Sequence, residues 1–154
     1  MIRVGDNIPS INTMIKEGTE TKWTSTHKLF ENKKILLLGL PGLFLVEYAA
    51  SQVKTYDFYF QKFKELGLDE IWFTSVDDTY VQRAWIKNDG LQNINALPDP
   101  MGEWAENIGM AEDMSREGLG TKRSHRYAMV IDNLIMKHMK YEDFKREFVI
   151  EEPK

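Results

Sequence analysis

The sequence predicts an α/β domain in which helices flank a mixed central sheet, and three observations carry that prediction. Residues 34–40 form a continuous apolar segment that ends at Pro41, which is typical of a central strand covered on both faces. Two further apolar strands, at 70–76 and 94–97, are each preceded by a helical pattern. The apolar segments within 127–139 flank a polar turn and predict an antiparallel hairpin, which makes the sheet mixed.

The N-terminal part is expected to contain a strand, a short helix and a long helix. Residues 8–15 are predicted to form an edge strand or hairpin arm, because Pro9 lies near its start, where a missing N–H does least harm. A hydroxyl N-cap predicts a short helix over 24–30. A long helix should follow from about 46 to 66, with Gly67 at its C-terminus. Aromatic residues at helical spacing should give this long helix one apolar face: Tyr56, Tyr59, Phe60 and Phe63.

Local capping signals place two more helices. Asp77 or Asp78 is expected to cap a helix that ends at Gly90. Residues 98–100 predict a turn into a short helix that contains Trp104. Strands and helices therefore alternate as far as the final hairpin.

Composition limits the number of domains and the classes of partner. The chain has 154 residues with 20 basic and 24 acidic side chains, and its net charge is −4. We expect a single domain over 1–154, in which 141–154 is a short C-terminal tail of unpredicted structure. The mild acidity argues against nucleic acid as a partner. Apolar residues 35–46 are interrupted by Gly39 and Pro41, so no membrane span is expected, and the polar N-terminus favours a cytoplasmic location.

The absence of cysteine removes several chemistries. The sequence contains no cysteine, which excludes disulfides, thiolate nucleophiles and cysteine-ligated metals. The three histidines, His27, His125 and His138, are scattered and have no ligand-spaced companion. We therefore expect neither a metal site nor a cofactor.

Five short motifs occur in order and at workable spacing: Val4-Gly5-Asp6-x-Ile8-Pro9, Leu40-Pro41-Gly42-x-Phe44, Ser75-Val76-x-Asp78 followed by Trp85, Leu97-Pro98-Asp99-x-x-Gly102, and Arg123-Ser124-x-Arg126-Tyr127-x-Met129-Val130. Together they resemble the peroxiredoxin-5-like branch of the peroxiredoxins. These proteins belong to the alkyl hydroperoxide reductase and thiol-specific antioxidant superfamily. The resemblance covers the chain to about residue 140 and implies a thioredoxin-like fold.

The resemblance also implies an active-site loop of the form Pro-x-x-x-Thr-x-x-Cys, with a distant arginine beside it. Pro41 and Arg126 match the proline and the arginine, but Leu45 replaces the threonine and Tyr48 replaces the peroxidatic cysteine. A phenol with a pKa of ~10 is mostly protonated at neutral pH, and it cannot form a sulfenic acid. We therefore expect the site to be degenerate and thiol peroxidase activity to be absent.

The block of changes around this loop has more than one interpretation. Six residues are candidates for binding at the former site: Leu43, Phe44, Leu45, Glu47, Tyr48 and Arg126. The apolar side chains could fill a collapsed site, or they could line a reshaped pocket for a small apolar or anionic ligand. A redesigned or diverged site could also do other chemistry, with Tyr48 and Glu47 as acid and base and Arg126 as an anion clamp.

Two further expectations follow from the resemblance. A guanidinium left from an anion site needs a partner, so we expect Glu47 or the Tyr48 hydroxyl to satisfy Arg126. Members of this branch commonly pair through a surface beside the active-site loop, which implies a homodimer. The family name would also invite assignment as a thioredoxin- or glutathione-dependent peroxidase, although these residues do not support that activity.

Overall fold

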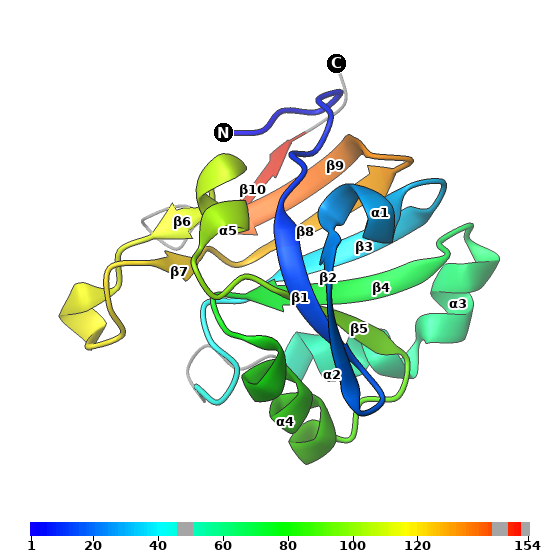
Figure 1. Ribbon diagram of the computed structural model, residues 1–154. Coiled ribbons are helices and arrows are strands. Elements are labelled where there is room, and N and C mark those ends of the chain that lie inside the picture. Colours follow the sequence, from blue (N-terminus) through cyan, green and yellow to red (C-terminus); the bar gives the residue numbers. More distant parts are fainter. Residues whose placement is uncertain (46–50, 143–147, 152–154) are drawn as a thin grey trace.

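A six-stranded mixed sheet forms the centre of the domain (Figure 1). The computed structural model describes residues 1–45, 51–142 and 148–151. The three N-terminal strands of the sheet run parallel and β8 pairs antiparallel to β3, so the predicted mixed α/β sheet is confirmed. In spatial order the strands are β10 (Phe148–Glu151), β9 (Ile135–Glu142), β8 (Tyr127–Asp132), β3 (Lys34–Gly39), β4 (Glu70–Ser75) and β5 (Ile94–Pro98).

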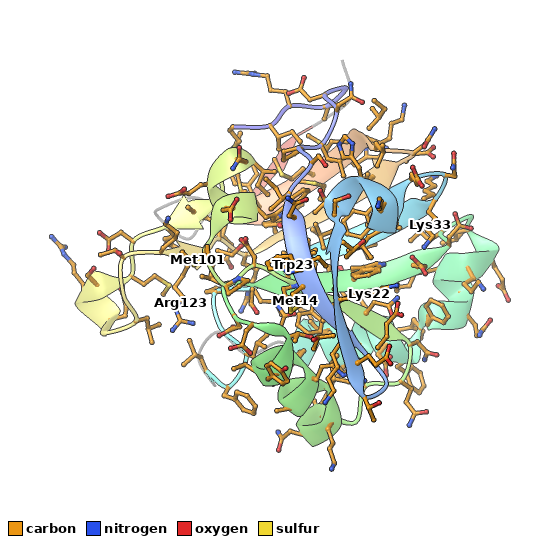
Figure 2. All side chains as sticks on the ribbon, in the orientation of Figure 1. Met14, Lys22, Trp23, Lys33, Met101 and Arg123 are labelled. Atoms are coloured by element: carbon orange, nitrogen blue, oxygen red, sulfur yellow. The ribbon has the colours of Figure 1, made fainter. Side chains whose placement is uncertain are left out.

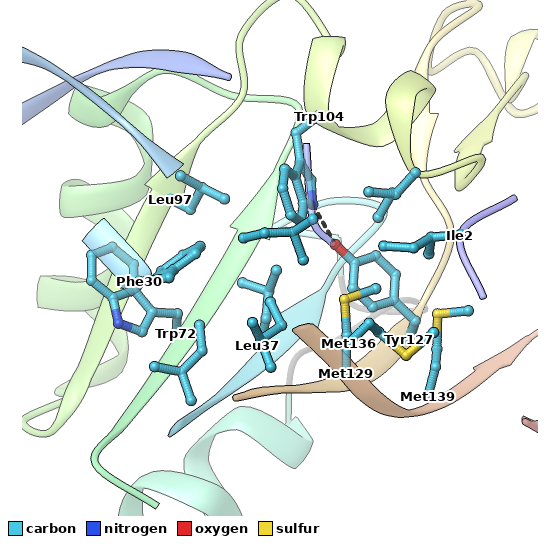
Figure 3. Packing of buried hydrophobic residues seen from close by; sticks show 14 of the residues in the cluster. Ile2, Phe30, Leu37, Trp72, Leu97, Trp104, Tyr127, Met129, Met136 and Met139 are labelled. Atoms are coloured by element: carbon cyan, nitrogen blue, oxygen red, sulfur yellow. Dashed lines mark hydrogen bonds between the residues drawn. The ribbon is translucent and has the colours of Figure 1, made fainter. Parts of the chain in front are cut away.

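The sheet separates two apolar cores, which explains the continuous apolar sequence of β3. Ile35 and Leu37 belong to one buried cluster, whereas Leu36 and Leu38 belong to the other. The first cluster packs under α1 (Thr26–Phe30) and α5 (Glu103–Asn107), and Figure 3 shows part of it. The second packs under three helices: α2 (Ser51–Phe58), α3 (Phe60–Glu65) and α4 (Thr79–Asp89). A strand that is covered on both faces has no face exposed to water, so its sequence does not alternate between apolar and polar residues.

The N-terminal hairpin differs in register from the prediction. The first strand, β1, spans Asn12–Glu17 rather than 8–15, and it pairs antiparallel with β2 (Glu20–Ser25). The prediction of a hairpin arm is therefore confirmed, but its bounds were wrong and β2 was missed. Most of β2 is exposed, so it lacks the apolar alternation that reveals a half-buried strand.

The long helix is interrupted, contrary to the prediction of one helix to residue 66. The described part begins at Ser51 and splits into α2 and α3 at Tyr59, whose side chain is 44% exposed. The prediction of a single aromatic face was wrong for Tyr59. The other three aromatic residues pack partly buried against the second cluster: Tyr56, Phe60 and Phe63. Gly67 follows the end of α3 with a φ of 100°, which agrees with its predicted place at the helix terminus.

The capping predictions for the helix that ends at Gly90 are confirmed, and the predicted hairpin is confirmed with its turn one residue later than the expected Asp132-Asn133. Asp78 Oδ1 accepts a hydrogen bond of 2.9 Å from the amide of Val81 at the start of α4, and Gly90 ends that helix with a φ of 66°. The hairpin of β8 and β9 turns through Asn133 and Leu134, both of which have positive φ. A leucine in the left-handed region is uncommon, and sequence patterns did not foresee it.

Four small elements were not predicted. A short antiparallel pair, β6 (Ala111–Glu112) and β7 (Arg123–Ser124), encloses the 3-10 helix η2 (Ser115–Glu117). Strand β10 gives structure to part of the tail and pairs antiparallel with β9. Within the described ranges, no helix is long and apolar enough to cross a membrane.

Candidate functional site

The loop that follows β3 carries most of the predicted site. The amide of Leu40 donates to the carbonyl of Thr74 at 2.9 Å, which extends the contact with β4 beyond the end of β3. Pro41 is buried, and Leu43 is only 5% exposed and belongs to the second core cluster. Phe44, in contrast, is 56% exposed. The loop is therefore anchored through its proline and one leucine while its phenylalanine faces outward.

Leu45 packs against the backbone of its own loop. A Cβ added at Gly42 would lie 2.3 Å from Leu45 Cδ1, so the leucine tip occupies the space directly over this glycine. The side chain is half-buried there. At the position where the resemblance implies a hydroxyl, the structure thus has an apolar side chain turned back onto the loop. Glu47 and Tyr48, the two remaining predicted residues of this segment, lie outside the described residues.

Arg126 has a carboxylate partner that sequence reasoning missed. Its Nη1 lies 4.0 Å from Glu142 Oε1, and the two side chains are only 21% and 15% exposed. The amide of Glu142 also donates to the carbonyl of Arg126 at 3.0 Å, because the β8–β9 ladder places the two residues side by side. A separation of 4.0 Å is an ion pair without a direct hydrogen bond. The expected pairing of Arg126 with Glu47 or Tyr48 stays a prediction, since neither partner lies in the described part.

A small cavity of about 70 Å³ opens beside Arg126. Strands β3 and β8 contribute its backbone wall, and helix α2 contributes Gln52 and Tyr56. Lys140 of β9 brings a second cation to the rim. The structure therefore places two cations, Arg126 and Lys140, beside a small cavity with a mainly apolar lining, and Glu142 pairs with one of them.

A second arginine holds the proline loop from the opposite side. Arg123 Nη1 donates to the carbonyl of Pro41 at 3.4 Å, and its Nε donates to the carbonyl of Leu119 at 3.0 Å. The same guanidinium lies near Asp77: burial raises the pKa of this carboxyl, while a hydrogen bond from Ser75 and the charge of Arg123 oppose the rise. Arg123 was part of the recognised motif, but nothing in the sequence indicated this bridging role.

Under the site, a buried polar chain fixes the start of β8. Trp104 Nε1 donates to the Tyr127 hydroxyl at 2.9 Å (Figure 3). The ring of Tyr127 fills the space beside Gly39, where an added Cβ would lie 2.0 Å from its Cε2. Burial raises the pKa of the Tyr127 phenol, so it stays neutral and can accept this hydrogen bond. Tyr127 adjoins Arg126 in sequence, and its packing therefore fixes the backbone at the start of β8.

Asp99 holds the start of α5 in this same region. Its carboxylate accepts the amides of Trp104 at 2.9 Å and Ala105 at 3.0 Å, and the residue is only 4% exposed. Burial raises the pKa of this carboxyl to about 6, although both hydrogen bonds favour the charged form. Desolvation is thus the larger effect at Asp99.

Two of the three histidines, His27 and His125, lie close to oxygen atoms of neighbouring residues. His27 Nε2 lies 2.8 Å from the carbonyl of Ile8, and the buried His125 has its Nδ1 3.8 Å from Glu112 Oε2. Across residues 1–45, 51–142 and 148–151, no group of three or more His, Asp or Glu side chains could hold a metal ion. The described site places the cations Arg126 and Lys140 beside an apolar loop.

Comparison with known proteins agrees with this fold. The family model described as Redoxin matches residues 3–154. Peroxiredoxin-2D of Arabidopsis thaliana is 33% identical over 135 residues, which cover 86% of this chain and 83% of that protein. The hybrid peroxiredoxin hyPrx5 of Haemophilus influenzae is also 33% identical, over 88% of this chain and 56% of its own length.

Solved structures give the same result. The antioxidant protein of Plasmodium falciparum, a 1-Cys peroxiredoxin, superposes with a TM-score of 0.87 at 29% identity, covering 94% of this chain and 86% of that one. Reduced Prx3 of Vibrio vulnificus in complex with hydrogen peroxide gives a TM-score of 0.87 at 28% identity, covering 94% and 90%. These neighbours confirm the thioredoxin-like fold.

The chain belongs to the peroxiredoxin family, within the redoxins. It contains no cysteine. The chain spans between 56% and 60% of the length of three of the curated peroxiredoxins it matches, from Haemophilus influenzae, Rhizobium etli and Synechocystis.

Proposed function

We propose that this protein is a binding member of the peroxiredoxin family without thiol peroxidase activity. The observation that carries the proposal is the absence of cysteine, which leaves no side chain able to cycle through a sulfenic acid. The packing of Leu45 over Gly42 supports it, because an apolar tip stands where a hydroxyl would bind peroxide. Pro41 and Arg126 are then vestiges of the site that keep its shape.

Peroxide consumption tests this proposal. We expect no turnover of hydrogen peroxide or an organic hydroperoxide by the parent protein, with either thioredoxin- or glutathione-based reductants. Tyr48→Cys combined with Leu45→Thr should gain turnover, because the thiol and the hydroxyl return to the two positions that the peroxiredoxin motif assigns to them. Ser115→Cys, at an exposed position of η2, controls for the reactivity of any added thiol. Turnover by the cysteine-free parent would contradict the proposal.

The proposed binding role centres on the cavity beside Arg126. Its volume of about 70 Å³ and the cations Arg126 and Lys140 suit a small anion, which is the anionic ligand expected from the sequence. Isothermal titration with formate should detect binding to the parent, and Arg126→Gln should weaken it about tenfold, because one of the two cations is lost. Lys137→Gln, at an exposed position on the same strand as Lys140, is the control. Equal binding by the parent and Arg126→Gln would contradict this site.

We further propose a homodimer that pairs through the surface beside the loop. The exposed Phe44 supports it, since an aromatic side chain that is 56% exposed next to the former site suits an interface core. Sedimentation should show a dimer for the parent and a monomer for Phe44→Asp, whereas Phe58→Asp, at an exposed position of α2, should remain dimeric. A monomeric parent at high micromolar concentration would overturn the dimer.

We also propose a cytoplasmic location for the protein, and cell fractionation tests this location.

A further inference from the structure

A groove of about 890 Å³ follows the β5 edge of the sheet, outside the loop and cavity described above. Ile94, Asn95 and Ala96 of β5 line it in the middle. The tip of the β1–β2 hairpin, at residues 15–18, forms one wall, and α4 forms the other. Figure 1 shows the β1–β2 hairpin crossing in front of β5, with its tip and α4 both below that strand in the view. The volume is within the range of ~300–1,000 Å³ typical of ligand clefts.

The edge of β5 is open for strand pairing. Strand β5 is the last strand of its sheet and pairs only with β4 in the described part of the chain. Its contact with β1 includes a side-chain hydrogen bond at one end, from Thr13 Oγ1 to the carbonyl of Pro98 at 2.7 Å. Asn95 is exposed and Ala96 is small and half-buried, so neither side chain blocks the approach of another backbone. An edge of this kind can accept an added strand.

The walls of the groove carry positive charge that is not neutralised. Two acidic residues at the groove are already paired, Glu70 with Lys33 and Glu17 with Lys22, each at 3.1 Å. Figure 2 labels the two lysines of these pairs, Lys22 and Lys33. The remaining cations have no carboxylate partner among the described residues: Lys16 on the hairpin, and Arg83 and Lys87 one turn apart on α4. Three cations without a carboxylate partner at one groove, in a chain of net charge −4, indicate an anionic occupant.

We propose that this groove binds an extended acidic segment of a partner protein, which adds to β5 as a further strand. Backbone groups of the segment would pair with the free edge of β5, and its acidic side chains would face the cations on the two walls. The groove also has apolar lining at Ile15, Leu29 and Trp72, which suits apolar side chains at alternate positions of the segment. An edge strand between two basic walls would recognise both the backbone of the segment and its negative charge. The site shares no residue with the former peroxidase loop, so it does not depend on the function proposed above.

Two synthetic peptides test the proposal directly. The probe is acetyl-Glu-Val-Glu-Val-Glu-Val-amide with a fluorescent label, and its counterpart has lysine in place of each glutamate. Fluorescence anisotropy should show saturable binding of the acidic peptide and none of the basic one. In isotope-labelled protein, the NMR amide signals of Asn95 and Ala96 should shift when the acidic peptide binds, and these two amides should gain protection from hydrogen exchange. Absence of binding by the acidic peptide would overturn the proposal.

Charge reversal on the helix wall separates the groove from general attraction. Arg83→Glu with Lys87→Glu should weaken binding of the acidic peptide by about tenfold or more, since two of the three free cations are reversed. Arg116→Glu with Lys137→Glu makes the same change of charge at exposed positions outside the groove, and it should leave the affinity within about twofold. An equal loss in both double variants would mean that only net charge matters, and would refute the site.

N-methylation tests strand addition itself. Two versions of the acidic peptide carry N-methyl groups on alternate amides, one version for each edge of the strand. The version methylated on the edge that faces β5 should lose binding, because its N–H donors are removed while its charge is kept. If both methylated peptides bind as well as the parent peptide, the groove recognises an anion without strand pairing and the proposal is wrong.

Discussion

Asp99 should make the folded domain less stable as the pH rises from about 4 to about 7. Its carboxyl is 4% exposed, and burial raises its pKa from 3.8 to about 6. The folded state therefore holds the proton more tightly than the unfolded state does. The stabilisation from that proton is complete below the unfolded pKa and is lost as the pH rises through the folded pKa.

The size of the effect follows from the two pKa values. A rise from 3.8 to about 6 corresponds to about 3 kcal/mol, of which about 2 kcal/mol falls between pH 4 and pH 7. Asp99→Asn cannot titrate and keeps an acceptor for only one of the two helix amides. Loss of one hydrogen bond should therefore lower the free energy of unfolding of the variant by about 1–3 kcal/mol at every pH, in addition to the effect of titration.

Urea unfolding followed by circular dichroism, at half-unit steps of pH, measures the difference between the parent and Asp99→Asn. The advantage of the parent should shrink by about 2 kcal/mol across the range as the carboxyl ionises. Asp113 is an exposed acid whose pKa is lowered by Ser115, and Asp113→Asn serves as the control, with no such decline. An advantage that stays constant, or that grows with pH, would mean that the two amide hydrogen bonds outweigh burial at Asp99.

Four further substitutions probe the packing around the site. Gly39→Ala should lower the free energy of unfolding by about 1–3 kcal/mol or more in thermal denaturation, because its Cβ would meet the buried Tyr127 ring at 2.0 Å; an unchanged midpoint would refute that contact. Tyr127→Phe should cost about 1–3 kcal/mol, because the buried Trp104 N–H loses its acceptor, and a cost below about 0.5 kcal/mol would show that it finds another. Gly42→Ala should lower the free energy of unfolding by less, because the added Cβ meets the movable tip of Leu45. In urea unfolding, Leu45→Ala should reduce the loss caused by Gly42→Ala. Additive effects of the two substitutions would contradict the contact.

Local chemistry made much of the fold predictable. The apolar continuity of β3, the Asp78 cap and the Gly90 terminus each depend on neighbours close in sequence, and all three were confirmed. The failures share a different cause. Strand β2 is exposed and has no buried face to reveal it, and Tyr59 marks a helix break that has neither glycine nor proline as a signal.

The candidate site also has some features that the sequence determined and others that only the tertiary structure decided. The amino-acid sequence by itself determined that no thiol is present, and it placed Pro41, Leu45 and Arg126 at positions that resemble a peroxidase loop. Only the tertiary structure decided that Arg126 lies against Glu142, because their proximity comes from the register of two antiparallel strands. The open β5 edge likewise depends on strand order, and its basic walls come from segments distant in sequence. Residue identity limits which reactions are possible, whereas the meeting of distant residues is set by long-range packing that sequence periodicity does not encode.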